Sequence, residues 1–155
     1  MIVRKATKQD AATILTLIEH KAEFDRGMKG FSGEISTTVD KIECTLFGDM
    51  PFAHALLLEN DHDVVGFALF HYRYSSFSGS PSLWLDDLLV LSEQRSQGFG
   101  NLLMDAVKAQ AQAVMASHIA WTASPHNQRA HDFYLRIGAE IERMDGARPY
   151  FRWSV

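Results

Sequence analysis

The sequence predicts an α+β protein with a mixed central sheet of six to seven strands, flanked by about four helices. An apolar run at Leu83–Leu91, broken only by Asp86 and Asp87, is typical of a strand buried on both faces. From Gly98 onward the apolar residues recur at helical spacing. Between these two patterns lies the basic, glycine-containing turn Arg95–Gly100, so a strand, a turn and a helix form the centre of the fold.

The segments before this centre supply two helices and three further strands. Thr7 and Asp10 form a capping pattern in front of an amphipathic stretch, which predicts the first helix. The stretch 21–33 is polar and contains three glycines, which indicates a flexible loop. In chain order we expect a strand at Ile2–Lys5, a helix ending near His20, a loop at Lys21–Gly33, a helix at Val39–Phe47, and strands at His54–Glu59 and Val64–Tyr74.

After the long central helix the expected elements are shorter. Pro125 and Asn127 open a helix in an otherwise strand-rich region. We expect strands at Ile119–Ala123, Ala139–Met144 and Tyr150–Val155. With no internal repeat and no linker composition, residues 1–155 are predicted to form a single domain.

Composition excludes several classes of function. The chain is 46% hydrophobic and 22% charged with a net charge of −4, which is typical of a soluble globular protein and disfavours nucleic-acid binding. No apolar run approaches the roughly 18 residues of a membrane span, and the first residues lack a secretory pattern, so we expect no membrane association and a cytoplasmic location. Cys44 is the single cysteine, and no spacing of His, Cys and acidic residues predicts a metal site.

The turn at Arg95–Gly100 is suited to bind an anion. A helix that begins here directs unpaired main-chain N–H groups and the positive end of its dipole outward. Gly98 and Gly100 lack the Cβ atoms that would keep a ligand away from the backbone. Neither the dinucleotide pattern nor the Gly-Lys-Ser/Thr loop of nucleoside triphosphate binding is present. A diphosphate is therefore the expected ligand, unless the turn only caps a helix.

The motif Arg-x-x-Gly-x-Gly, with a strand before it and Asn127 and Tyr134 after it, resembles the acetyl-CoA site of the GNAT acyltransferase superfamily. The order of expected elements is similar to the GNAT acyl-CoA N-acyltransferase fold over nearly the whole chain. Within the superfamily the chain looks most like the spermidine/spermine (diamine) N-acetyltransferase branch. The stretches that carry this resemblance are Val65–Ala68 with Tyr72 and Tyr74, Leu85–Val90, Arg95–Gly100, and Asn127 through Phe133-Tyr134 to Gly138-Ala139.

The resemblance implies which residues bind acetyl-CoA. Main-chain groups of one strand would pair with the pantetheine arm, the turn would hold the pyrophosphate, and the start of the next helix would contact the cofactor from the other side. The residues in these three groups are Leu88, Leu89 and Val90; Arg95, Ser96, Gln97, Gly98, Phe99, Gly100 and Asn101; and Asn127, Gln128, Arg129 and Ala130.

Two residues are the predicted catalytic groups. Tyr134 would protonate the departing thiolate, because a phenol with a pKa near 10 keeps its proton at neutral pH; alternatively it only packs beside Phe133. Asp86 occupies the place of a glutamate that helps to deprotonate the amine, of which about one molecule in a thousand is unprotonated at neutral pH. The aspartate side chain is shorter than that of a glutamate, so a water would bridge Asp86 and the amine. Alternatively, Asp86 and Asp87 form a β-bulge that only interrupts the strand. Adjacent carboxylates point to opposite faces of a strand, so at most one belongs to the site.

The implied acceptor site is less well defined. Phe24 and Asp25 match an aromatic–acid pair, or else form an ordinary loop pair. The other substrate-side residues are Asp86, Ala120, Trp121 and Thr122, although Trp121 is equally expected in the core. Arg26 and Lys29 place positive charge where the diamine branch is acidic. A smaller amine or a lysine analogue therefore fits as well as a polyamine.

The sequence thus predicts an acetyl-CoA-dependent N-acetyltransferase that acetylates a primary amine of a small molecule by direct attack in a ternary complex. Two alternatives stay open at this point: a GNAT enzyme for an amino-acid or protein N-terminal amine, and a non-catalytic CoA-binding sensor. A homodimer is expected from the resemblance alone.

Overall fold

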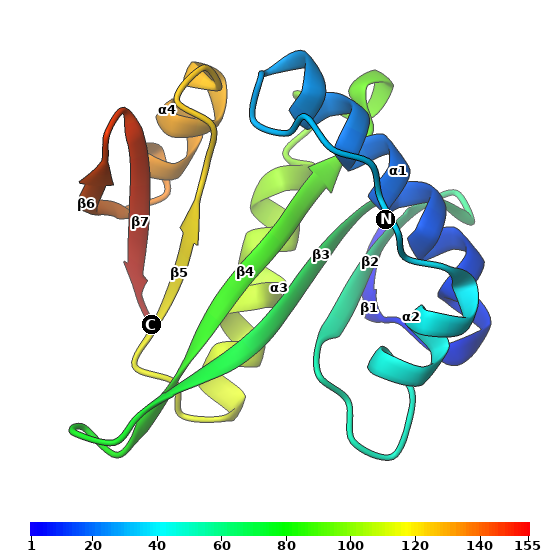
Figure 1. Cartoon of the computed structure of the whole chain (residues 1–155), viewed down its shortest axis with the longest axis horizontal. Helices are drawn as coiled ribbons and strands as arrows, with labels where there is room; N and C mark the ends of the chain where they lie inside the picture. The colour runs from blue at the N-terminus through cyan, green and yellow to red at the C-terminus, as the bar shows by residue number, and fades with distance from the viewer.

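A computed structural model describes residues 1–155 as one seven-stranded sheet with the order β1-β2-β3-β4-β5-β7-β6 (Figure 1). All neighbouring strands are antiparallel except β4 and β5, which are parallel. The strands are β1 (Ile2–Lys5), β2 (His54–Asn60), β3 (Asp63–Ser75), β4 (Ser80–Val90), β5 (His118–Thr122), β6 (Glu140–Asp145) and β7 (Arg148–Ser154). The predicted mixed sheet is confirmed.

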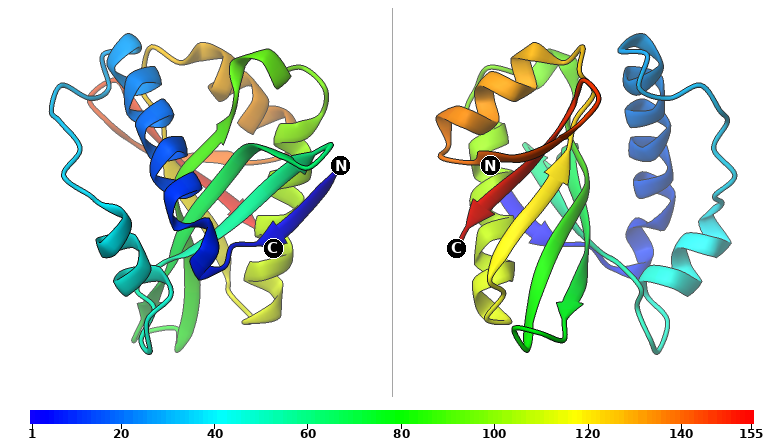
Figure 2. Two further views of the ribbon diagram at one scale, coloured as in Figure 1. Left: turned by 90° about the vertical axis from the view of Figure 1, so that its right-hand side faces the viewer. Right: turned by 60° about the vertical axis from the view of Figure 1, so that its left-hand side comes forward.

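Four helices cover the two faces of the sheet, with α1 and α2 on one side and α3 and α4 on the other (Figure 2). They are α1 (Ala11–Gly27), α2 (Val39–Leu46), α3 (Phe99–Ala113) and α4 (Gln128–Arg136), together with the 3₁₀ turns η1 (Lys8–Asp10) and η2 (Ser92–Gln94). Each face has its own core, a cluster of 8 buried residues under α1 and α2 and one of 19 under α3 and α4. Because both faces are covered, β2 and β4 are apolar on both sides.

The first helix is longer than the sequence predicted. The expected loop at Lys21–Gly33 is wrong for its first part, because α1 continues to Gly27. Ala22 is buried, and Lys21 bridges to Asp25 one turn later at 2.7 Å. An ion pair at this spacing supports a helix, and the polarity that suggested a loop belongs to the less buried side of α1. This extension carries Phe24 and Asp25 on a helix rather than on a loop.

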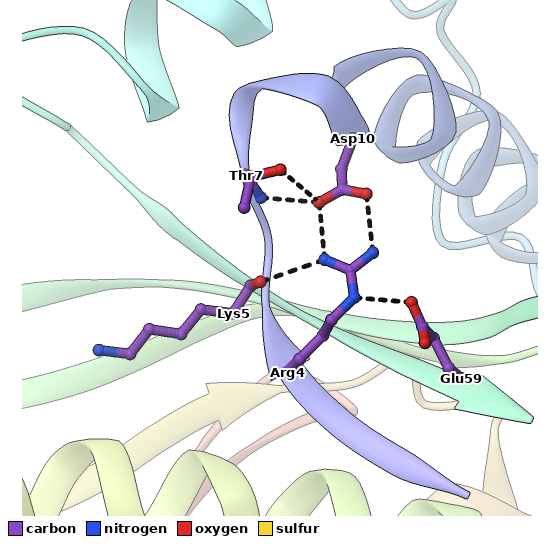
Figure 3. Close-up of polar contacts among 5 residues, drawn as sticks. All are labelled: Arg4, Lys5, Thr7, Asp10 and Glu59. Carbon is purple, nitrogen blue, oxygen red and sulfur yellow. Dashed lines mark hydrogen bonds and ion pairs between the residues drawn. The ribbon is translucent and has the colours of Figure 1, made fainter. Parts of the chain in front are cut away.

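Arg4 fixes the start of α1 against the edge of the sheet (Figure 3). Its Nε donates to Glu59 Oε1 at 2.6 Å, and its Nη1 and Nη2 donate to the two oxygens of Asp10 at 2.8 and 2.9 Å. Asp10 also accepts the main-chain N–H of Thr7 at 2.7 Å. The hydrogen bond from Arg4 lowers the pKa of the Asp10 carboxyl to about 2. This network joins β1, η1 and β2, and so orients the helix that reaches the site.

The two parallel strands separate soon after they meet. Leu83 pairs with Ile119 and Trp84 with Ala120, and no further pairs join β4 and β5. From Leu85 to Val90 the strand β4 pairs with β3 alone, so its other edge keeps free main-chain groups (Figure 1). The register also shifts inside this segment, since Leu69 pairs with Asp87 and Phe70 with Leu85, which leaves Asp86 as the extra residue of a β-bulge.

Candidate active site

Two hollows open where β4 and β5 separate. The large cavity has a volume of about 770 Å³, and the small pocket has one of about 60 Å³. The large cavity is lined by Phe24, Leu88–Val90, Arg95, Ser96, Gly98–Asn101, Asn127, Arg129, Ala130, Asp132–Tyr134 and Arg136. The small pocket is lined by Lys21, Phe24, Asp25, Leu85, Asp86, Leu88, Trp121–Ser124, Asn127 and Tyr134. Phe24, Leu88, Asn127 and Tyr134 line both, so the two hollows meet at these side chains.

The turn before α3 presents main-chain donors to the large cavity. The first hydrogen bond of α3 joins the N–H of Leu102 to the carbonyl of Gly98 at 3.2 Å, so the N–H groups of Phe99, Gly100 and Asn101 have no carbonyl partner. Gly98 has φ of +80° and Ser96 has φ of +66°. A left-handed conformation at position 98 favours glycine, and it allows the chain to turn sharply from η2 into α3. The structure therefore contains the turn and the helix start that the sequence predicts, and their free N–H groups are suited to bind an anion.

Gly100 serves helix packing as well as the ligand surface. A Cβ atom at this position would lie 3.2 Å from Cζ of Phe133 on α4. The absence of a side chain lets the start of α3 approach α4 across the large cavity. From the sequence motif we expected a glycine here only because a Cβ atom would keep a ligand away from the backbone. The close approach of Phe133 is a second reason, and it is visible only in the tertiary structure.

Two arginines connect the walls of the large cavity. Arg95 Nε donates to the carbonyl of Val90 at 3.0 Å, and its guanidinium lies 4.9 Å from the ring centre of Phe24 on α1. Arg129 Nη2 on α4 donates to Ser96 Oγ at 2.8 Å. Burial and the charge of Arg129 both lower the pKa of Arg95. A site with two nearby cations in a partly enclosed cavity favours an anionic ligand.

Tyr134 lies at the junction of the two hollows. Its side chain is buried, with 8% of the residue exposed, and its ring meets Trp121 and Phe151 edge to face at centroid distances of 5.0 and 5.1 Å. Burial, and after it the charge of Asp25, raises the pKa of Tyr134 to about 12. The phenol is therefore protonated at neutral pH and can donate a proton.

The adjacent carboxylates of β4 have different environments because of the bulge. Asp86 is exposed and lines the small pocket. Asp87 does not line it. Its pKa is raised to about 6, mainly by burial, with smaller contributions from the charges of Asp86 and Asp25, and the charge of Lys21 opposes the shift. The expectation that at most one of the pair belongs to the site agrees with this arrangement.

Residues 21–139 match the acetyltransferase (GNAT) family. The chain belongs to this family. It is 28% identical over 148 residues to the thialysine N-epsilon-acetyltransferase of Bos taurus, an alignment that covers 90% of this chain and 84% of that protein. It is 34% identical over 82 residues to the L-ornithine N5-acetyltransferase of Arabidopsis thaliana, covering 53% of this chain and 36% of that protein.

The fold of the chain is also that of solved acetyltransferases. The paia N-acetyltransferase of Thermoplasma acidophilum in complex with coenzyme A superposes with a TM-score of 0.78 at 15% identity, covering 99% of this chain and 98% of that one. The predicted GNAT fold and the predicted acetyltransferase class are thus confirmed. The amine acetyltransferases among the relatives agree with the branch that the motifs resemble.

Most of the residues that the sequence nominated in this GNAT acetyltransferase line one of the two hollows. Among the cofactor candidates only Gln97 and Gln128 lie outside the large cavity; both are exposed, and Gln128 donates to Asp132 Oδ1 at 2.9 Å. Among the substrate candidates Ala120 lies outside the small pocket, because it is buried in the sheet between Trp84 and Arg152. Its neighbours Trp121 and Thr122 line the pocket.

The structure adds lining residues from α1 and α4 that were not among the predicted site residues. On α4 they are Asp132, Phe133 and Arg136, which follow Arg129 at helical spacing; on α1 the addition is Lys21, four residues before Asp25. In both cases the three- or four-residue spacing was a usable signal. Trp121 contributes a further feature, since its buried Nε1 has no hydrogen-bond acceptor within the chain.

Two further structural findings concern the whole acetyltransferase chain. No group of three or more His, Cys, Asp or Glu side chains is arranged to hold a metal ion. None of the helices combines the length and the apolar character that crossing a membrane requires.

Proposed function

We propose that this acetyltransferase transfers the acetyl group of acetyl-CoA to a primary amine of a small molecule, either diamine- or polyamine-like or a lysine analogue. The observation that carries the proposal is the position of Tyr134, whose protonated phenol borders both the large cavity and the small pocket. Acetyl-CoA would occupy the large cavity and the amine the small pocket, so that the reacting groups meet beside this side chain.

The large cavity fits the chemistry of coenzyme A. At Leu88–Val90 the edge of β4 away from β3 pairs with no strand and offers main-chain groups to the amides of the pantetheine arm, next to the Val90 carbonyl that Arg95 already contacts. The free N–H groups at Phe99–Asn101, with Arg95 and Arg129 nearby, suit the pyrophosphate. Asn127 and Ala130 would contact the cofactor from the α4 side. Bound acetyl-CoA supplies the acetyl group as a thioester.

The small pocket provides for the amine. An alkylammonium group with a pKa near 10.4 must lose a proton before it can react at neutral pH. Asp86 would accept that proton through a water, after which the amine lone pair attacks the thioester carbonyl directly. As the C–N bond forms and the C–S bond breaks, the phenol of Tyr134 would donate its proton to the sulfur, and the second proton that the nitrogen loses would return to the Tyr134 oxygen through water. The products are the N-acetyl amine and CoA with a free thiol.

The relatives support an amine acceptor, because the names of two of them specify thialysine and L-ornithine. Each of these molecules bears a primary amine on a flexible chain. The homodimer and the cytoplasmic location that the sequence suggested stay predictions.

An acceptor screen tests the proposed function. Purified protein is incubated with acetyl-CoA and one acceptor at a time, drawn from diamines, polyamines, thialysine and amino acids; free CoA is followed with time, and the product is identified by mass. We expect acetylation of at least one small primary amine. Binding of CoA without acetylation of any acceptor would contradict the proposal, as would a CoA complex in which the pyrophosphate lies away from the turn before α3.

A further inference from the structure

Lys21 is the only basic side chain that lines the small pocket. It projects from α1, one turn before Asp25, and its Nζ lies 2.7 Å from both carboxylate oxygens of Asp25. The same Nζ lies 4.0 Å from Oδ1 of Asp87 on β4. Its side chain is 20% exposed, so most of it is enclosed between α1 and the sheet. The chain itself therefore places an ammonium group in the acceptor pocket.

This ammonium changes what the acidic residues of the pocket can bind. Two carboxylates line the pocket, Asp25 and Asp86, and Asp25 already has both oxygens bonded to Lys21. Asp86 is the one left for the reacting amine. A second ammonium group on the acceptor would meet the charge of Lys21 within a partly enclosed space, where repulsion between like charges is stronger than in water. A polycation is therefore disfavoured.

The same ammonium favours an acceptor with a carboxylate. A lysine side chain has three N–H donors, and Asp25 occupies two of them. The third donor is available to a carboxylate on the acceptor, which would form a charge-assisted hydrogen bond. An amino acid brings this carboxylate next to its own α-ammonium group, whereas a diamine brings a second ammonium group without one.

We infer that Lys21 sets the charge selectivity of the acceptor site, so that the preferred acceptor is the side-chain amine of an amino acid rather than a diamine or a polyamine. This inference rests on the proposed function and narrows its substrate class. Lys21 acts here as a specificity-determining residue, and it takes no part in bond making or breaking.

The test uses acceptors that differ by one carboxylate. L-ornithine and putrescine form one matched pair, and L-lysine and cadaverine form another. The measured quantity is the ratio of kcat/KM between the two members of a pair. We expect the wild-type protein to prefer the amino acid, and Lys21→Gln to lower the ratio about tenfold, the usual size of one charge-assisted hydrogen bond. Lys21→Arg should keep the preference, and Lys8→Gln, at an exposed position away from the pocket, should leave it unchanged.

A ratio cancels any general loss of activity from a damaged fold, so the outcomes are distinct. If amines are acetylated but the wild-type protein prefers the diamines, or if Lys21→Gln leaves the ratio unchanged, the role of Lys21 is disproved while the proposed function stands. If no acceptor in either pair or in the wider screen is acetylated, the proposed function fails, and the inference fails with it.

Discussion

The rings of Trp121 and Tyr134 meet edge to face, with centroids 5.0 Å apart and planes inclined at 65°. Trp121 comes from β5 and Tyr134 from α4, so the contact joins two elements that form one side of the gap beside β4. Phe151 packs against both rings. The phenol ring is held by packing, whereas the hydroxyl would supply the chemistry. Mutation can separate these two contributions.

Replacing Tyr134 by Phe keeps the ring and removes the proton donor. We expect kcat to fall by about 100-fold, the usual contribution of a general acid, with a much smaller change in the KM for acetyl-CoA. Steady-state kinetics at saturating acceptor measures both constants. Tyr74→Phe is a matched control at an exposed tyrosine and should have wild-type kinetics. An unchanged kcat in Tyr134→Phe would remove Tyr134 from the acid role.

Replacing Asp86 by Asn should make the reaction depend more strongly on pH. Near neutral pH we expect kcat/KM for the amine to fall by about 10- to 100-fold, because the amine loses its proton acceptor. Above about pH 9 a growing share of the amine is already unprotonated, so the difference from the wild type should shrink. Asp86→Glu, which keeps the carboxylate, should retain most activity at neutral pH. A deficit of the same size at all pH values would disprove the role in deprotonation.

Replacing Asp87 by Asn should stabilise the protein at neutral pH. Burial raises the pKa of Asp87 from 3.8 to about 6, so the unfolding free energy falls as pH rises between these values, because the folded state holds a proton that the unfolded chain releases. The difference between 3.8 and about 6 corresponds to about 3 kcal/mol, with the attraction to Lys21 already included. Urea denaturation near pH 7.5 should show the gain.

The same comparison near pH 4 provides the control for Asp87, because the wild-type carboxyl is then largely protonated in the folded state and the two proteins should have nearly equal stability. If Asp87→Asn is less stable than the wild type near pH 7.5, the ion pair with Lys21 outweighs the cost of burial, and the sign predicted here is wrong.

Replacing Gly98 by Ala should weaken the turn before α3. The backbone at this position has φ of +80°, which costs a residue with a Cβ atom about 1 kcal/mol. We expect lower thermal stability and a higher Kd for CoA, measured by calorimetry. Gly27→Ala is the matched control, because a Cβ atom there would meet no atom within 4 Å and the residue ends α1. If Gly98→Ala and Gly27→Ala have the same thermal stability and the same Kd for CoA, the left-handed conformation at position 98 contributes to neither property.

The order of the elements and the location of the turn before α3 could be predicted from the sequence. These features depend on local properties: the spacing of apolar residues in β4 and α3, and the glycines at the start of the helix. The resemblance to the GNAT superfamily then nominated Asn127 and Tyr134, and both residues line the large cavity and the small pocket. The end of α1 was predicted to be a loop because the stretch Lys21–Gly33 is polar and contains three glycines. In the structure the polar residues Lys21 and Asp25 form an ion pair on a helix.

The assembly of the site depends on tertiary contacts that the sequence alone does not reveal. These contacts determine that β4 and β5 separate after two residue pairs, that a bulge gives Asp86 and Asp87 different environments, and that Lys21 lines the small pocket. Each of these features arises from contacts between segments far apart in the chain. Periodicity describes one element at a time, and so it cannot specify which side chains of different elements meet.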